Sequence, residues 1–263
     1  MNILDEIIAA KRIEVEETKK TLSLDTIVCN SSFRKGKSFQ QSLIESPFGI
    51  IAEFKRKSPS KGWIFEKAKI EDVVPEYAQA GASAISILTN KPFFGGSYDD
   101  LRKARAFVDI PLLNKDFIVD EYQLYMAKSA GADVVLLIAA ALTCKECYTL
   151  AAKAKELGLE VLLEVHSYEE IAFLNEHIDV IGVNNRNLTT FKTEIQLSFD
   201  LAKKIPANMV KIAESGIMMP EVVKDLKAAG FNGFLIGERL MMTHEPGNAL
   251  RQLISDLNKN KHA

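Results

Sequence analysis

The sequence has little cysteine: Cys29, Cys144 and Cys147 are its only three among 263 residues. Such an odd, sparse set cannot form a disulfide framework, and it fits a reducing compartment such as the cytoplasm. Cys144 and Cys147 have the spacing of a metal or redox motif, but no second CxxC pair accompanies them. We therefore interpret both as ordinary residues near the start of a helix and expect no metal site.

The sequence also lacks a long hydrophobic run. Its longest apolar stretch, from Val134 to Leu142, is too short to cross a bilayer. The first twenty residues carry acids and bases throughout, so they lack the apolar centre of a signal peptide. These features predict a cytoplasmic protein with no membrane partner.

Neither sign of charge dominates, since 33 basic side chains face 35 acidic ones. This balance gives no reason to expect a nucleic-acid partner, so we expect a small-molecule partner and a monomer or weak homodimer. A chain of this length with 47% hydrophobic residues can bury one large α/β core. Because no linker rich in Pro, Gly or Ser divides it, we expect a single domain over residues 1–263.

Short apolar runs alternate with longer amphipathic segments after about Phe48, which is the pattern of βα units around a parallel sheet. Eight runs are candidate strands: GIIAEFK from Gly49, SAISILT from Ser83, PLLNKDF from Pro111, DVVLLIA from Asp133, EVLLEVH from Glu160, VIGVNNR from Val180, VKIAESG from Val210 and GFLIGE from Gly233. Eight units in a chain of this length predict a (β/α)8 TIM barrel. A doubly wound sheet is the second choice, because no GxGxxG turn follows the first strand.

Residues 1–45 stand outside this repeat and predict a helical extension packed on the barrel. Apolar residues at Leu4, Ile7, Ile8, Ile13 and Val15 lie within a charged sequence, as in an amphipathic helix. Two interpretations remain open. The helix is either a surface brace or a cap that helps to exclude water from the barrel mouth.

Polar residues follow or end nearly every predicted strand. In a (β/α)8 barrel the carboxyl ends of the strands build the active site. Side chains two residues apart share a strand face, so Glu53 and Lys55 should point into one cavity. Charges placed there without a function would be expensive to desolvate. The residues in these positions are Glu53, Lys55, Lys115, Glu164, His166, Asn184, Arg186, Glu214 and Ser215.

Glycines near the last two strands indicate a phosphate site. Gly216 lies where strand seven runs into its loop, and Gly237 and Glu238 lie where strand eight ends, at the start of a possible short helix. Glycine lets backbone N–H groups approach an anion closely, and these two loops form the recurring phosphate site of the fold. A phosphorylated ligand is therefore expected.

Six segments together resemble the indole-3-glycerol phosphate synthase family over essentially the whole chain: IIAEFKRKSPSKG, KDFIVDEYQ, LLEVHS, IGVNNRNL, IAESGI and FLIGERLM. The resemblance implies a carbon–carbon lyase of tryptophan biosynthesis that needs no cofactor. Its substrate would be 1-(2-carboxyphenylamino)-1-deoxyribulose 5-phosphate, and its products indole-3-glycerol phosphate, CO2 and water.

The resemblance also implies residue roles. Lys115 would be the principal general acid and Glu164 the general base, while Lys55 and Glu53 would bind substrate and assist proton transfer. The substrate-binding positions are Asn184, Arg186, Glu214, Ser215, Phe94 and Phe117, with the two phenylalanines as walls for the aromatic ring. The phosphate-binding positions are Ser58, Gly216, Gly237 and the backbone of Glu238. His166 matches no family role, and we interpret it as structural.

The chemistry fits these residue types. An acid must protonate the alkoxide that forms at ring closure, and a lysine desolvated among other cations would have a pKa lowered towards neutrality. We therefore expect a lowered pKa at Lys115. Two alternatives are a Schiff-base aldolase, which also places a lysine at a strand end, and a sugar-phosphate sensor without catalysis. The sensor would need the phosphate loops but not Lys115 and Glu164 together.

Overall fold

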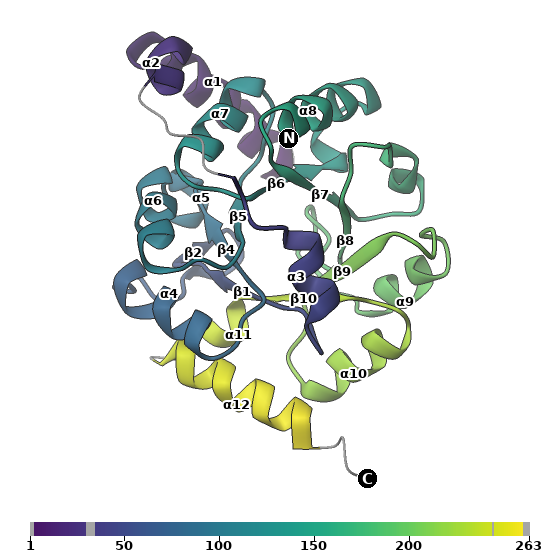
Figure 1. Cartoon of the computed structure of the whole chain (residues 1–263). Coiled ribbons are helices and arrows are strands. Elements are labelled where there is room, and N and C mark those ends of the chain that lie inside the picture. The colour runs from purple at the N-terminus through teal and green to yellow at the C-terminus, as the bar shows by residue number, and fades with distance from the viewer. Residues whose placement is uncertain (1–2, 30–34, 244, 260–263) are drawn as a thin grey trace.

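Eight parallel strands close into a barrel in the computed structural model, which describes residues 3–29, 35–243 and 245–259 (Figure 1). They are β1 (Ile50–Phe54), β4 (Ala84–Leu88), β5 (Leu112–Lys115), β6 (Val134–Ile138), β7 (Glu160–Val165), β8 (Val180–Asn184), β9 (Val210–Glu214) and β10 (Gly233–Ile236). β1 pairs with both β4 and β10, so the sheet has no edge. The predicted (β/α)8 barrel is confirmed, and the doubly wound alternative is wrong.

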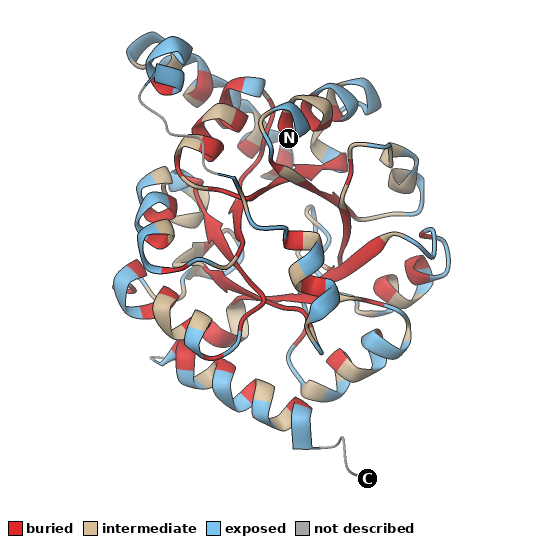
Figure 2. Ribbon diagram, viewed as in Figure 1, coloured by how far each residue is buried: buried red, intermediate tan, exposed pale blue. Residues whose placement is uncertain are grey.

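Helices surround the barrel and bury residues on the side that faces it (Figure 2), and most of these buried residues belong to one hydrophobic cluster. The longer ones are α4 (Ile70–Gln79), α6 (Tyr98–Phe107), α7 (Glu121–Ser129), α8 (Cys144–Glu156), α9 (Gln196–Ala202), α10 (Pro220–Ala228) and α12 (Pro246–Lys259). Short helical turns are α5 (Lys91–Phe94), η1 (Ala139–Ala141), η2 (Glu169–Phe173) and α11 (Glu238–Met241). No helix among the described residues is long and apolar enough to cross a membrane.

The cysteine pair opens α8, as the sequence predicts. Thr143 caps this helix and forms a capping box with Glu146, and Cys147 is buried against the barrel while Cys144 is exposed. Within the part of the chain that the structure describes, no group of three or more His, Cys, Asp or Glu side chains could hold a metal ion.

The strands alternate between an outer and an inner face. The inner face is apolar near the middle of the barrel, where Ile51, Leu113, Leu162 and Ile212 pack in one cluster. Two residues further along, each of these strands places a polar side chain on the same face. Those polar side chains are Glu53, Lys115, Glu164 and Glu214.

Helix α3 (Phe39–Glu45) closes the amino-terminal end of the barrel and crosses its centre in Figure 1. Phe39 and Leu43 are buried in the inner cluster. Gln40 donates to the backbone oxygen of Asp179, just before β8, and Ser42 donates to that of Ser83, just before β4. Helix α3 therefore seals the end of the barrel opposite to the strands' carboxyl ends.

Helix α1 (Ile3–Thr21) lies at the carboxyl end, followed by α2 (Leu24–Cys29). Its buried residues are Leu4, Ile7, Lys11 and Val15, whereas Ile13 is 61% exposed, so the expected apolar role of Ile13 is wrong. Residues 1–2 and 30–34 of the expected extension lie outside the described residues.

Candidate active site

A cavity of about 360 Å³ opens at the carboxyl ends of the strands. Its volume is within the range of small-molecule sites. Of the strand-end residues, His166 does not line the cavity. Every residue to which the sequence gave a catalytic or binding role does line it: Glu53, Lys55, Ser58, Phe94, Lys115, Phe117, Glu164, Asn184, Arg186, Glu214, Ser215, Gly216, Gly237 and Glu238. The structure therefore brings together side chains from strands that are far apart in the sequence.

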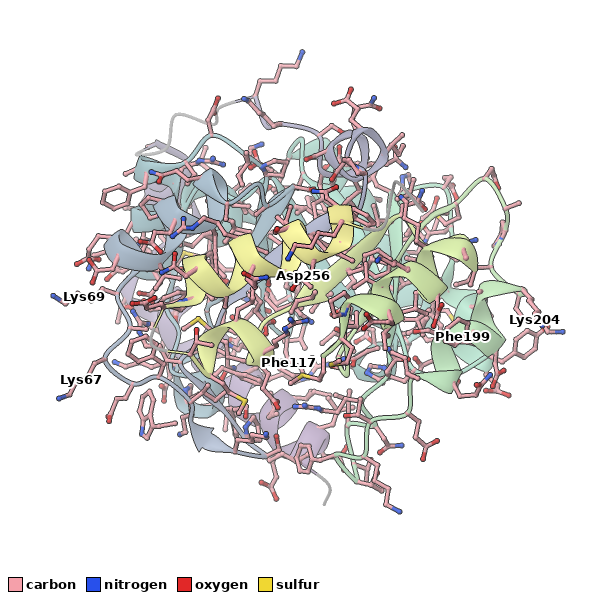
Figure 3. All side chains as sticks on the ribbon, turned by 90° about the horizontal axis from the view of Figure 1, so that it is seen from below. Lys67, Lys69, Phe117, Phe199, Lys204 and Asp256 are labelled. Atoms are coloured by element: carbon pink, nitrogen blue, oxygen red, sulfur yellow. The ribbon has the colours of Figure 1, made fainter. Side chains whose placement is uncertain are left out.

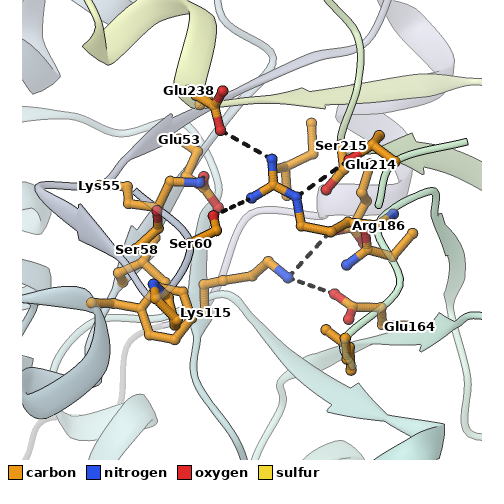
Figure 4. A pocket seen from close by; sticks show the side chains of 18 of the residues that line it. Glu53, Lys55, Ser58, Ser60, Lys115, Glu164, Arg186, Glu214, Ser215 and Glu238 are labelled. Carbon is orange, nitrogen blue, oxygen red and sulfur yellow. Dashed lines mark hydrogen bonds and ion pairs between the residues drawn. The ribbon is translucent and has the colours of Figure 1, made fainter. Parts of the chain in front are cut away.

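Lys115 lies at the centre of the charged groups (Figure 4). Its Nζ donates to Glu164 Oε2 at 2.6 Å and is 3.2 Å from Glu214 Oε2. The Glu164 and Glu214 side chains are each 2% exposed. A partly buried ammonium thus joins two buried carboxyl groups from β7 and β9.

Carboxylates, and not cations, control the protonation of Lys115. Burial by itself would lower the pKa of Lys115, but the charges of Glu164, Glu214 and Glu53 outweigh burial and raise that pKa above its usual range. The expectation of a lowered pKa is therefore wrong. The substrate-free protein holds Lys115 in its charged form.

The two carboxylates next to Lys115 differ in protonation. Burial alone would raise the pKa of Glu164, but Lys115 and His166 lower it well below its usual range. Burial raises the pKa of Glu214 to about 7, and the nearby negative charges add to burial while Lys115 offsets part of it. At neutral pH, Glu164 is therefore ionised, whereas Glu214 is protonated in about half of the molecules.

Glu53 and Lys55 form the second ion pair, with Nζ of Lys55 donating to Oε2 of Glu53 at 2.5 Å. The two side chains are 5% and 12% exposed, respectively. A Cβ atom at Gly237 would lie 2.1 Å from Glu53 Oε2. The glycine expected to approach phosphate is thus also required for the Glu53 carboxylate to occupy its position.

Gly182 on β8 makes room for Glu214 in the same way, because a Cβ there would lie 2.4 Å from Glu214 Oε1. Sequence reasoning missed this residue. The signal was a glycine inside a buried strand, which often marks a close approach to that strand.

The loop after β9 turns sharply at Ser215 and Gly216, whose φ values are +64° and +75°. A positive φ is uncommon for a serine, and such strained positions gather at functional sites. Consecutive residues in unusual backbone conformations can direct their N–H groups towards one point, as anion-binding turns do.

Glu238 is already engaged by two cations. Its carboxylate is 2.8 Å from Lys61 Nζ and 3.0 Å from Arg186 Nη2. Burial by itself would raise the pKa of Glu238, but these two cations lower it. Lys61 belongs to the hairpin of β2 (Lys57–Ser58) and β3 (Gly62–Trp63), so the ion pairs connect the first loop to the last one. Sequence reasoning missed Lys61.

The apolar side of the cavity comes from aromatic rings and from α1. The ring centroids of Phe94 and Phe117 are 6.2 Å apart. Phe117 lies inside the molecule in Figure 3, where lysines such as Lys67 project at its periphery. Ile3, Leu4 and Ile7 of α1 also line the cavity, which favours the cap over the surface brace.

Solved structures share the barrel. The α-subunit of tryptophan synthase from Pyrococcus furiosus matches with a TM-score of 0.61 and 14% identity, over 80% of this chain and 97% of that one. Thiamine phosphate pyrophosphorylase from the same organism matches with a TM-score of 0.60 and 16% identity, over 84% of this chain and 100% of that one. At such low identity these similarities show the fold alone.

Sequence relatives are much closer. A family model described as indole-3-glycerol phosphate synthase matches residues 4–253. The indole-3-glycerol phosphate synthase of Bacteroides thetaiotaomicron is 55% identical over 96% of this chain and 98% of its own length. That of Burkholderia vietnamiensis is 42% identical over the same shares of the two chains. The chain therefore belongs to the indole-3-glycerol phosphate synthase family.

Proposed function

We propose that Lys115 is the general acid and Glu164 the general base in the conversion of 1-(2-carboxyphenylamino)-1-deoxyribulose 5-phosphate to indole-3-glycerol phosphate, CO2 and water. The observation that carries this proposal is the partly buried contact of 2.6 Å between the two side chains inside the cavity. This contact supports the two roles, because an ammonium can donate a proton and a carboxylate can accept one, and each charge favours the ionised form of the other.

Ring closure needs the acid. The aromatic carbon that bears the carboxylate attacks the ribulose carbonyl, and the carbonyl oxygen becomes an alkoxide that must take up a proton. Lys115 supplies this proton. The raised pKa of Lys115 keeps the amine protonated at neutral pH. The amine can still give up this proton, because an alkoxide is more basic than a lysine amine.

Loss of CO2 then restores the aromatic ring, and dehydration completes the indole. Dehydration needs a base to remove one proton and an acid to protonate the departing hydroxyl. Glu164 takes the first proton, since its lowered pKa keeps it ionised. Either Lys55 or Lys115 supplies the second, and both side chains line the cavity.

Binding is divided between the two halves of the cavity. Phe94 and Phe117 stack against the aromatic ring of the substrate, and Lys55, held by Glu53, offers charge to its carboxylate or phosphate. The phosphate binds to the backbone at Gly216, Gly237 and Glu238, with Ser58 near it. Residues 1–45 form an extension of the single barrel domain. Helix α1 of this extension excludes water from the side of the cavity that Phe94 and Phe117 line.

The ribulose hydroxyls are bound by Asn184, Glu214, Ser215 and Arg186. The Asn184 oxygen already accepts a hydrogen bond from the Arg186 backbone N–H at 3.0 Å. The NH2 group is therefore the part of Asn184 that can donate to a substrate hydroxyl. Glu214, with a pKa of about 7, can accept or donate there.

Turnover tests the proposal directly. The purified protein is incubated with the carboxyphenylamino-deoxyribulose phosphate, and the formation of indole-3-glycerol phosphate is followed by fluorescence. We expect catalytic turnover by the wild-type protein and its loss in Glu164→Gln. Absence of turnover by the wild-type protein would refute the proposed activity, and full activity of Glu164→Gln would refute the role of Glu164.

The Schiff-base aldolase is tested by borohydride trapping with a sugar phosphate. An aldolase would be labelled at Lys115 or Lys55, whereas we expect no label at either. The ion pair of Lys115 with Glu164 supports this expectation at Lys115, because an ammonium whose pKa is raised above its usual range is a poor nucleophile.

A further inference from the structure

His166, which the sequence gave no role, lies between two carboxylates. Its Nε2 is 3.3 Å from Glu164 Oε1, and its Nδ1 is 3.6 Å from Glu170 Oε2. The side chain is only 12% exposed, and His166 is not among the residues that line the cavity. The imidazole therefore contacts the proposed base without itself lining the cavity.

The two oxygens of Glu164 have different partners. Oε2 accepts from Lys115 at 2.6 Å, and Oε1 faces His166. A carboxylate held at both oxygens cannot rotate about its last bond without losing a charged contact. The contacts with Lys115 and His166 together thus fix the plane of the Glu164 carboxylate.

Glu170 holds His166 in turn. Its Oε2 accepts a hydrogen bond from the backbone N–H of His166 at 2.6 Å and also faces the Nδ1 atom of the ring. Glu170 lies in η2, the turn that follows β7, so a local segment orients the ring. This arrangement of carboxylate, imidazole and carboxylate is typical of histidines that support another catalytic group.

We propose that His166 is a positioning residue that holds Glu164 in its reactive orientation and keeps it ionised, and that Glu170 fixes His166 in that place. The inference rests on the proposed role of Glu164 as the general base. It replaces the interpretation of His166 as merely structural.

The charge state of the ring supports this role. Burial by itself would lower the pKa of His166, but Glu164 and Glu170 outweigh burial and raise it to about 9. The charged groups facing the ring are Glu164 on β7 and Glu170 on η2, and Lys115 of β5 lies beyond Glu164. An imidazolium therefore stands beside the carboxylate at neutral pH, with both nitrogens able to donate.

Two variants of His166 test the proposal. For each, the steady-state formation of indole-3-glycerol phosphate is measured across pH. His166→Phe keeps an aromatic ring but removes both donors, and His166→Gln keeps one donor. We expect His166→Phe to lower kcat by about 10- to 100-fold, as loss of groups that orient a ligand does, with KM nearly unchanged. Its acid limb of kcat/KM should move to higher pH, because Glu164 then binds a proton more readily. His166→Gln should recover part of kcat.

Glu170→Gln is the second line of evidence, since it leaves His166 in place. We expect a smaller loss of kcat that grows as pH rises, because the imidazole then loses its proton more easily. Glu169→Gln is the matched control: it makes the same change one residue away, at an exposed side chain, and should behave as wild type.

Superimposable kcat and pH profiles for His166→Phe and the wild-type protein would overturn the proposal. So would equal losses in His166→Phe and His166→Gln with an unmoved acid limb, because packing alone would then explain them. Glu164→Gln, measured in parallel, separates the proposed role of Glu164 as the base from the role of His166 in positioning it. If Glu164→Gln is inactive and His166→Phe is normal, only the role of His166 fails.

Discussion

Lys11 of α1 and Asp116, the residue after Lys115, form a buried ion pair in which Nζ and Oδ2 are 3.1 Å apart. The two side chains are 1% and 0% exposed. Thr89 donates to the same carboxylate oxygen at 2.8 Å, and Asn114 of β5 donates to Thr89. The first helix is thus tied by charge to the strand end that carries the proposed acid.

Removal of the cation should therefore destabilise the fold at α1. Lys11→Met leaves the buried Asp116 carboxylate without its cation, and breaking a buried ion pair in this way costs about 3–5 kcal/mol. We expect a loss of that order in the free energy of unfolding, measured in urea. KM should also rise, because α1 supplies three residues to the cavity wall.

Two further variants make this result specific. Lys20→Met removes an exposed lysine from the same helix and should change stability by less than about 0.5 kcal/mol. Lys11→Met combined with Asp116→Asn should recover part of the loss, since no buried charge then lacks a partner. Equal stability of Lys11→Met and Lys20→Met would contradict the importance of the pair.

Gly182→Ala should impair catalysis more than folding. The added methyl group would meet the Glu214 carboxylate at 2.4 Å and push it from Lys115. We expect kcat to fall about tenfold or more, because misplacement of such groups by about 1 Å is costly. Glu214→Asp in the same protein shortens the side chain and should restore part of kcat. A fully active Gly182→Ala protein would show that the placement of Glu214 is not critical.

Glu238→Gln should strengthen phosphate binding. The Glu238 carboxylate repels an incoming phosphate and occupies the cations of Lys61 and Arg186. Its neutralisation should lower KM, and the inhibition constant of inorganic phosphate, by about fivefold, near 1 kcal/mol for a partly exposed charge. Lys61→Met should raise both constants. A higher KM in Glu238→Gln would instead indicate that the carboxylate is needed to position Arg186.

Glu214 should make the folded protein less stable as pH rises towards 8. Its pKa is raised from 4.5 to about 7, so between these values the folded state holds a proton that the unfolded chain has lost. This stabilisation is complete below pH 4.5 and is lost as pH rises through 7. Urea unfolding at pH 5 and pH 8 should show a smaller difference for Glu214→Gln than for wild type. Equal differences would contradict the raised pKa.

The strands were predictable because their signal is local. Buried parallel strands are short apolar runs, and the period of two places Glu53 in line with Ile51 on the inner face. In a helix, residues four apart share a face. This helical period could have identified Lys11, which lies on one stripe with Ile7 and Val15. A lysine on an apolar stripe indicates a buried partner.

The surroundings of Lys115 were not predictable in this way. The carboxylates that surround it come from β1, β7 and β9, and these meet only when the sheet closes. A sequence shows which residues end the strands but not which charges become neighbours across the barrel. The error in the expected pKa of Lys115 has this origin, and so does the missed contact between Lys61 and Glu238.

The most direct measurement of the central claim is kcat for the formation of indole-3-glycerol phosphate by Lys115→Ala, compared with wild type. The control is Lys67→Ala, which removes an exposed lysine at the periphery of the molecule (Figure 3). Loss of a general acid lowers the rate by about 10²–10⁴-fold, so we predict a fall of that size in Lys115→Ala, with little change in Lys67→Ala. A Lys115→Ala protein with the kcat of the wild type would contradict the account.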